Sequence, residues 1–361
     1  MTCWTSSSSR TGLLAGLLFL LAAEVHAAEG HVPIALLPAS DTLNAGVPVD
    51  RITDALAAAL VARGFALVPA ERVQAVLRAR RERSVSGVSG PIAAALGTEA
   101  GAGAILVTAV DDWHEGEMPR VALTARLVGA TPEAPILWAD GTAHHALEKP
   151  GAFGLGLGKN ADDLLAMAAE ELAVSIARGR PSSSRKVEKR FLPRSLAATA
   201  PRDVPARRRV AVLPFFTDGP DRGLGDLLAL QFVRHLSEDP AYEIVEPGVV
   251  RQALLDTRVI QEDGVSLAQV DTVRALLDVD IVVSGRITQY DPLGLSPGSP
   301  SSGFSARAID ARTRRVVWSS FSYAAGDDGL RWFDTRWVRS GVLLTSDLVR
   351  GVLVQLEKAH P

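Results

Sequence analysis

The strongest constraint on the fold is a short apolar run that occurs twice in the sequence. The stretch 208–216 reads RRVAVLPFF, and PIALLPA at 33–39 precedes it with Ile34 placed 176 positions before Val210. Each run is aliphatic and interrupted by proline, which is typical of a strand buried on both faces in a sheet covered by helices. The sequence therefore predicts one α/β fold used twice.

The segments after each run also correspond in order and spacing. In the first copy we expect strands and helices, in order, at 33–38, 52–62, 65–68, 71–81, 91–96, 104–110, 121–128, 136–142 and 161–177. The second copy predicts matching segments at 210–215, 224–236, 242–245, 249–256, 280–285, 316–318 and 338–358. A chain of 361 residues is long enough for two separate cores. We therefore predict two similar domains, 28–178 and 209–361.

The segment between the copies, 179–208, has a different composition. It is interrupted by serine and proline and carries many arginines and lysines, opposed only by Glu188 and Asp203. Such a composition does not bury a core, so we expect a basic, flexible or extended linker. Its charge suits the outer membrane or anionic envelope polymers, and the simpler alternative is a soluble tether.

The N-terminus predicts export. Arg10 precedes an apolar run at 13–23, and the small residues of 25–27 suit signal-peptidase cleavage after Ala27. We therefore expect a signal peptide at 1–27 and a periplasmic protein, with a retained anchor as the alternative. A bacterial lipoprotein needs cysteine where this chain has Ala28, and its single cysteine, Cys3, lies before the apolar run.

Composition and motifs argue against several functional classes. A net charge of −3 with 22% charged residues is too little basicity for a nucleic-acid binder. The glycine-rich stretch 153–160 departs from a phosphate loop, because Phe153 and Asn160 occupy the required glycine and Ser/Thr positions. Asn160 is instead expected to cap the closing helix. The sequence predicts no cofactor and no nucleotide.

Metal and catalytic motifs are also weak. The acidic stretch 111–117 offers metal-capable side chains, but we expect it to form a solvated loop after a strand. His144 and His145 on an extended segment point to opposite faces and cannot chelate one ion as a helical pair does. The sequence has no nucleophile elbow, zinc-protease helix or cysteine centre. The chain is therefore not expected to be an enzyme.

Three stretches of the second copy together carry a family resemblance: RVAVLPF at 209–215, DIVVSGRI at 280–287 and VVWS at 316–319. The pattern resembles the domain shared by the TolB amino-terminal region, the curli secretion protein CsgG and the penicillin-binding-protein activator LpoB. The resemblance covers 209–357, and 32–177 is similar but departs at Ala39 and Ala109. It implies a small mixed β-sheet flanked by helices in each domain, and envelope proteins that act by binding other proteins, with no catalytic residues to carry over.

One segment is predicted to bind a partner protein, and the predicted function has two alternatives. Trp332, with Arg331 and Arg336, combines residue types enriched at protein contact hot spots, so we expect partner binding there; Trp337 is expected to seat the closing helix. The chain is thus predicted to be a non-catalytic exported adaptor or accessory protein in envelope assembly or secretion. The alternatives are an outer-membrane secretion-channel subunit, disfavoured by the short, proline-broken stretch 291–300, and an envelope hydrolase or nucleotide-binding enzyme.

Overall fold

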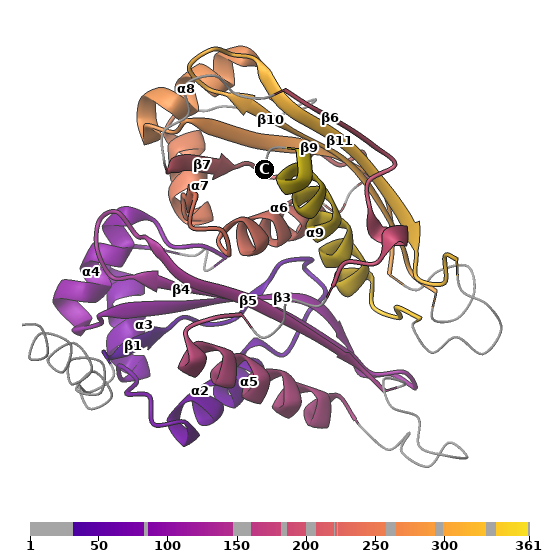
Figure 1. Cartoon of the computed structure of the whole chain (residues 1–361). Helices are drawn as coiled ribbons and strands as arrows, with labels where there is room; N and C mark the ends of the chain where they lie inside the picture. The colour runs from indigo at the N-terminus through magenta and orange to yellow at the C-terminus, as the bar shows by residue number, and fades with distance from the viewer. Residues whose placement is uncertain are drawn as a thin grey trace, which may run out of the picture. The chain divides into compact units, whose positions relative to one another are not determined.

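The computed structural model describes residues 32–82, 86–146, 160–181, 186–199, 207–219, 221, 223–257, 265–292, 299–329 and 337–359. Within the compact unit Pro33–Pro361, two β-sheets are each flanked by helices, as predicted (Figure 1). We call 33–181 the first half and 186–359 the second half. The predicted signal peptide, 1–27, lies outside the described residues.

The first half contains a mixed sheet. Strands β1 and β2 pair in parallel with β3, while β3, β4 and β5 form an antiparallel meander in the order β1-β3-β4-β5. Its elements are β1 (Ile34–Leu36), β2 (Ser40–Asp41), α2 (Val49–Ala62), α3 (Ala70–Ala79), α4 (Gly90–Ala100), β3 (Ala104–His114), β4 (Arg120–Gly129), β5 (Ile136–His145) and α5 (Ala161–Arg178).

The second half repeats this pairing and adds one strand at each side, in the order β6-β11-β10-β9-β7-β8. Strand β7 is parallel to β9, and β9, β10 and β11 are antiparallel. Its elements are η3 (Lys189–Phe191), β6 (Ser195–Ala198), β7 (Arg208–Val212), α6 (Gly223–Leu236), β8 (Tyr242–Ile244), α7 (Pro247–Asp256), α8 (Leu267–Leu277), β9 (Ile281–Asp291), β10 (Ser301–Asp310), β11 (Val316–Ala325) and α9 (Gly341–Ala359).

Each sheet has an apolar cluster on both of its faces. In the first half α2 and α5 cover one face, and α3 and α4 cover part of the other. In the second half α6 and α9 take the place of α2 and α5, and α7 and α8 take that of α3 and α4 (Figure 1). Strands in such a layered arrangement need apolar side chains on both faces, which explains the two uninterrupted runs in the sequence.

The ends of the closing helix α5 follow the sequence signals. Asn160 accepts a hydrogen bond from the backbone N–H of Asp163 at 2.8 Å, and the Asp163 side chain accepts one from the N–H of Asn160. This reciprocal capping box confirms the predicted role of Asn160. Gly179 then ends the helix in the left-handed conformation, with φ of 62°.

The predicted linker 179–208 differs from a flexible tether over its central part. Lys189–Phe191 forms one 3₁₀ turn, and Ser195–Ala198 adds to the second sheet as the edge strand β6, antiparallel to β11. Phe191 is 2% exposed in the core, and Leu196 packs against the same cluster. The average composition of 179–208 is dominated by basic and small residues, so it does not reveal the two buried apolar side chains.

The acidic stretch 111–117 forms the predicted loop only from Glu115 onward. Asp111–His114 continue β3, which runs from Ala104 to His114. A register irregularity between Val110 and Asp112 leaves Asp111 opposite no residue of β4, and its side chain is fully buried. Sequence periodicity does not reveal a buried carboxylate at a bulge, because the extra residue interrupts the alternation of apolar and polar side chains.

Two elements of the second half have no counterpart in the sequence prediction. Helix α8 begins with a capping box between Ser266 and Gln269, and β10 carries small and polar residues on one of its faces. No helix in the described part of the chain is long and apolar enough to cross a membrane.

Candidate functional site

Helix α6 joins the two halves because it contacts both sheets. Leu228, Phe232 and Leu236 belong to the core of the second half. On its other side α6 contacts β4 and β5 of the first half. There Leu227 packs with Ala122 in a small apolar cluster that also includes Ala143 and Val342. A helix buried on nearly every side must find partners for its polar side chains, and those of Gln231 and Arg234 come from the first half.

An arginine and a glutamate from different halves form a completely buried ion pair. Arg126 on β4 donates from Nε to Glu246 Oε2 at 3.1 Å and from Nη2 to Glu246 Oε1 at 3.0 Å. Both side chains are 0% exposed. Glu246 also caps α7 and accepts from the N–H of Val88. This two-pronged geometry fixes the second half against the first.

A second contact between the halves involves a carboxyl group that burial keeps protonated up to an unusually high pH. Thr124 lies 2.5 Å from Asp111 through its hydroxyl, and Gln231 of α6 donates to the same hydroxyl at 3.2 Å. Burial raises the pKa of Asp111 to about 7, although the hydrogen bond from Thr124 and the nearby Arg234 and Arg126 act in the opposite direction. Among the described residues, the Asp111 carboxylate forms no ion pair.

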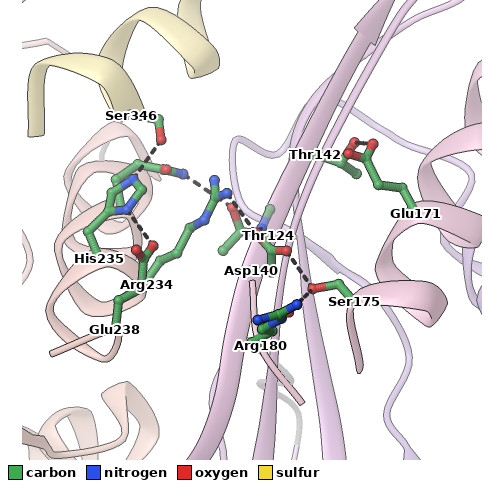
Figure 2. A network of polar contacts seen from close by, with 12 residues as sticks. Thr124, Asp140, Thr142, Glu171, Ser175, Arg180, Arg234, His235, Glu238 and Ser346 are labelled. Carbon is green, nitrogen blue, oxygen red and sulfur yellow. Dashed lines mark hydrogen bonds and ion pairs between the residues drawn. The ribbon is translucent and has the colours of Figure 1, made fainter. Parts of the chain in front are cut away.

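A third contact lies at the edge strand β5 (Figure 2). Arg234 of α6 donates to Asp140 Oδ1 at 2.6 Å, and the hydroxyl of Ser175 on α5 donates to Asp140 Oδ2 at 2.6 Å. Ser175 in turn accepts from the indole N–H of Trp138 at 3.2 Å. The Asp140 side chain is 1% exposed and that of Arg234 10% exposed. The network thus links α6 through β5 to α5.

The histidine next to Arg234 lies in an arrangement that resembles a hydrolase triad. His235 Nε2 lies 2.8 Å from Ser346 Oγ, and Nδ1 lies 2.9 Å from Glu238 Oε1 (Figure 2). Burial lowers the pKa of His235 to about 4, so the imidazole is a weak base at neutral pH. Ser346 is 5% exposed within helix α9, where the backbone N–H groups bond to the helix itself. The geometry connects α6 to α9. A cavity of about 260 Å³ is lined by His235 together with Tyr242 and Trp318, but Ser346 is not among its lining residues.

A hollow of about 670 Å³ lies beside the ion pair between the halves. Its polar lining includes Asp41, Asp226 and Arg251. The Asp41 carboxylate already accepts from the backbone N–H groups of Ala45, Gly46 and Val47. The lining also contains the hydroxyl of Ser86, which accepts from Arg251 Nη1 at 3.4 Å. With Asp41 held by backbone donors and Ser86 by an arginine, these two groups are not arranged as a general base and its nucleophile.

The metal-capable side chains considered in the sequence analysis lie in separate places. In the described part of the chain no group of three His, Cys, Asp or Glu side chains is placed to hold a metal. His144 lies on β5, with Nε2 3.0 Å from Glu171 and 2.9 Å from the Thr142 hydroxyl. The hydrogen bond with His144 lowers the pKa of Glu171. The glycine-rich 153–159 lies outside the described residues.

The predicted contact residues Arg331, Trp332 and Arg336 also lie outside the described residues. Trp337, expected to seat the closing helix, is half-buried just before α9, and the Arg339 guanidinium lies 4.2 Å from its ring centroid. The three contacts between the halves were not foreseen. Their one sequence signal is a charged or amide side chain inside an apolar run: Arg126 in the strand 121–128, and Gln231 and Arg234 in the helix 224–236.

The second half has an open sheet face. Phe304, Ala306 and Ala308 of β10 point into the core beneath α6 and α9, so Ser305 and Arg307 between them face the other way. We call this side, with Ser319 and Phe321 of β11, the open face. Phe321 is 40% exposed, Ser319 is exposed, and Ser305 and Arg307 are half-buried. Residues of this face line a shallow hollow with Phe216 and Arg286.

Comparisons with known proteins give fold-level similarity only. No family model matches, and no curated protein matches. Similar solved structures include a PelC dodecamer from Paraburkholderia phytofirmans, with 18% identity and a TM-score of 0.28 over 44% of this chain and 96% of that one. Lipoprotein GNA1162 from Neisseria meningitidis gives 18% and 0.31 over 41% and 99%. The LpoB C-terminal domain from Escherichia coli gives 10% and 0.25 over 34% and 87%. At these TM-scores we base no conclusion about function on them.

Proposed function

We propose that this chain is an exported, non-catalytic protein of the bacterial cell envelope that acts by binding other proteins, as an adaptor or accessory in assembly or secretion. The observation that carries the proposal is the open face of the second half. It combines a large exposed aromatic, Phe321, with hydroxyl groups and the partly exposed Arg307, a composition suited to protein contacts. The N-terminal signal pattern supports the periplasmic location.

The remaining polar groups favour binding over catalysis. Arg126, Glu246, Asp140 and Arg234 are each bonded to a side chain of the opposite half. They therefore fix the two halves and do not face a substrate. The arrangement of Ser346 with His235 supports the same reading, because a hydroxyl buried in a helix has no oxyanion donors free. A fluorophosphonate probe should leave Ser346 unmodified in the folded chain, and stoichiometric labelling would overturn the non-catalytic assignment.

The binding function is tested in cells that make the full chain. A photo-crosslinking amino acid at position 321 should capture one or a few envelope proteins. Leu276 offers a matched control, since it is a 50% exposed leucine on α8 and does not line the hollow of the open face. A position-321 pattern no different from that at position 276 would contradict the proposal.

Trp332 is a second proposed contact, with Arg331 and Arg336 beside it. Trp332→Ala should keep the melting temperature and reduce the amount of captured partner. The basic segment 179–208 is proposed to contribute attraction to anionic envelope polymers or outer-membrane lipid. Arg190 and Arg194 have additional roles, because they donate to the backbone carbonyls of Gly326 and Tyr323.

A further inference from the structure

The two halves use different surfaces in their contact with each other. Each half therefore has one surface that is equivalent to a contact surface of the other half but is not itself in contact. In the first half a sheet face receives the helix α6 and the helix cap Glu246 of the second half. The equivalent sheet face of the second half is the open face. The equivalent helices of the first half, α2 and α3, turn their outer sides to solvent. A contact of this head-to-tail kind can be repeated by a further copy.

Strand register establishes the equivalence of the two sheet faces. Ile34 pairs with Ala104 and Val210 pairs with Ile281, so these positions correspond. Three residues further, Val107 pairs with Arg126 and Ser284 pairs with Arg307. Arg307 therefore occupies in the second sheet the place that Arg126 occupies in the first. By the same register Phe321 of β11 corresponds to Gly141 of β5, since they pair with Ser305 and Thr124.

The two arginines have the same local surroundings but different partners. Arg126 donates to the carbonyl of Ser86, which lies in the loop before α4. Arg307 donates at 3.1 Å to the carbonyl of Val265, which lies in the loop before α8. Arg126 has the carboxylate of Glu246 as its countercharge. Among the described residues no carboxylate pairs with Arg307. What Arg307 lacks is the contribution that the other half makes to Arg126.

Helix α2 corresponds to α6 through the core. The buried residues Ile52, Leu56 and Leu60 match Leu228, Phe232 and Leu236 at a constant separation of 176 positions. At the same separation, Arg234 corresponds to Ala58. Ala58 is exposed on the outer side of α2.

Side-chain sizes are exchanged between the two interfaces. Between the halves, the large Arg234 lies over the small Gly141, where an added Cβ would come within 3.0 Å of Arg234 Nη1. At the equivalent places of the unused surfaces, the helix has the small Ala58 and the strand has the large Phe321. The carboxylate that binds Arg234, Asp140, is replaced by Ser320, so no buried charge would be left unpaired. In both places a large side chain faces a small one, as shape-complementary packing requires.

A countercharge for Arg307 is also available on the first half. Glu246 is the N-cap residue of α7, and the N-cap residue of the equivalent helix α3 is Pro69. The carboxylate nearest to that position in α3 is Glu71, two residues further in the first turn and exposed to solvent. Among the described residues Glu71 has no ion-pair partner. Glu71 occupies the position of Gly248, whose backbone lies against Gly87 and Val88 in the existing contact. The second contact therefore needs a slightly wider spacing at this point, which leaves the Glu71 carboxylate free to reach Arg307.

We infer that the open face of the second half binds the outer side of α2 and the start of α3 of a second copy of this chain. The inference rests on the proposed protein-binding function and names the partner. Ala58 would pack on Phe321, and Glu71 would face Arg307. The resulting head-to-tail contact leaves one free surface at each end, so copies can add until the assembly closes.

Sedimentation velocity of the purified full chain at several concentrations tests the inference. The wild type should show a mass above that of one chain, rising with concentration. Phe321→Arg and Ala58→Arg should each sediment as one chain, because each places a long cation where the opposite surface has no matching space. Leu276→Arg should sediment as the wild type does. The equivalent position in the first half is Glu99, whose exposed side chain pairs with Arg80 of the same half, so this position is not used in the existing contact between the halves.

Mixing the two variants separates the inference from simple misfolding. Phe321→Arg retains an intact helix surface, and Ala58→Arg retains an intact sheet surface. An equimolar mixture should therefore form a dimer of one copy of each and nothing larger. A wild type that stays monomeric at all concentrations, or a mixture that stays monomeric, overturns the inference. If crosslinking at position 321 in cells still captures other envelope proteins, the proposed function survives that failure.

Discussion

Removing the charge of Glu246 is the most informative perturbation of the fold, because this carboxylate holds Arg126 across the two halves. Both side chains are 0% exposed, and two hydrogen bonds of 3.1 and 3.0 Å join them. Glu246→Gln keeps the shape but turns an amide toward the guanidinium and leaves its charge buried without compensation. Such uncompensated burial costs about 3–5 kcal/mol. We expect the free energy of unfolding to fall by that amount.

Urea unfolding followed by circular dichroism and tryptophan fluorescence measures this loss. The matched control is Glu99→Gln, because Glu99 pairs with Arg80 at side-chain exposures of 46% and 40%. An exposed pair contributes less than about 1 kcal/mol. A decisive addition is Arg126→Met in the Glu246→Gln background. It removes the unpaired cation while glutamine still accepts from Val88 N–H, so the double variant should be more stable than Glu246→Gln alone.

Two results would refute this reasoning. A loss below about 1 kcal/mol for Glu246→Gln would place the pair with ordinary surface ion pairs. A double variant less stable than Glu246→Gln would mean that Arg126 contributes by packing and not by its pairing with Glu246.

Three further predictions concern separate parts of the molecule. Because the folded Asp111 has a pKa near 7 instead of the ordinary 3.8, the folded state holds more protons between these values. The stability of the wild type relative to Asp111→Asn should therefore decline as pH rises from 4 to 7, by up to about 1.4 kcal/mol per pH unit; a flat difference in urea titrations would count against the buried acid. Asn160→Ala removes the capping box of α5 and should cost about 1 kcal/mol in thermal unfolding, whereas an unchanged melting temperature would show that the cap is dispensable. Gly351→Ala places a Cβ 2.0 Å from the carbonyl oxygen of Phe191 and should expose Lys189 and Arg190 to trypsin. Gly219→Ala should not, because its added Cβ would have Thr217 Oγ1 as nearest atom at 3.8 Å, an ordinary contact distance; equal cleavage rates would contradict the docking of this segment on α9.

Much of the fold could be predicted from local patterns. The aliphatic runs ending in proline located β1 and β7, and helical spacing located α2, α5, α6 and α9 to within a few residues. These elements bury one continuous apolar stripe or face, which is the feature that periodicity detects. Strand β10 escaped prediction because Ser305 and Arg307 alternate with its core residues, on the part of the sheet face that α7 and α8 leave uncovered.

The site could not be predicted because it depends on contacts between distant residues. Arg126 and Glu246 are 120 positions apart, and the local sequence around either residue does not predict its partner. Phe191 and Leu196 were hidden in a basic, serine-rich segment because one anchor and one edge strand do not change its average composition. In each case the stabilising partner belongs to another element, so only the tertiary structure reveals it.

The most direct test of the head-to-tail contact is a disulfide between two different molecules. Cys3, the single cysteine, is replaced by serine, and Ala58→Cys and Phe321→Cys are made in separate chains. Under mild oxidation the mixture should yield a covalent dimer containing one chain of each kind, because bridged residues must lie within about 7 Å between Cα atoms. No more dimer in the mixture than in either variant alone would contradict the contact.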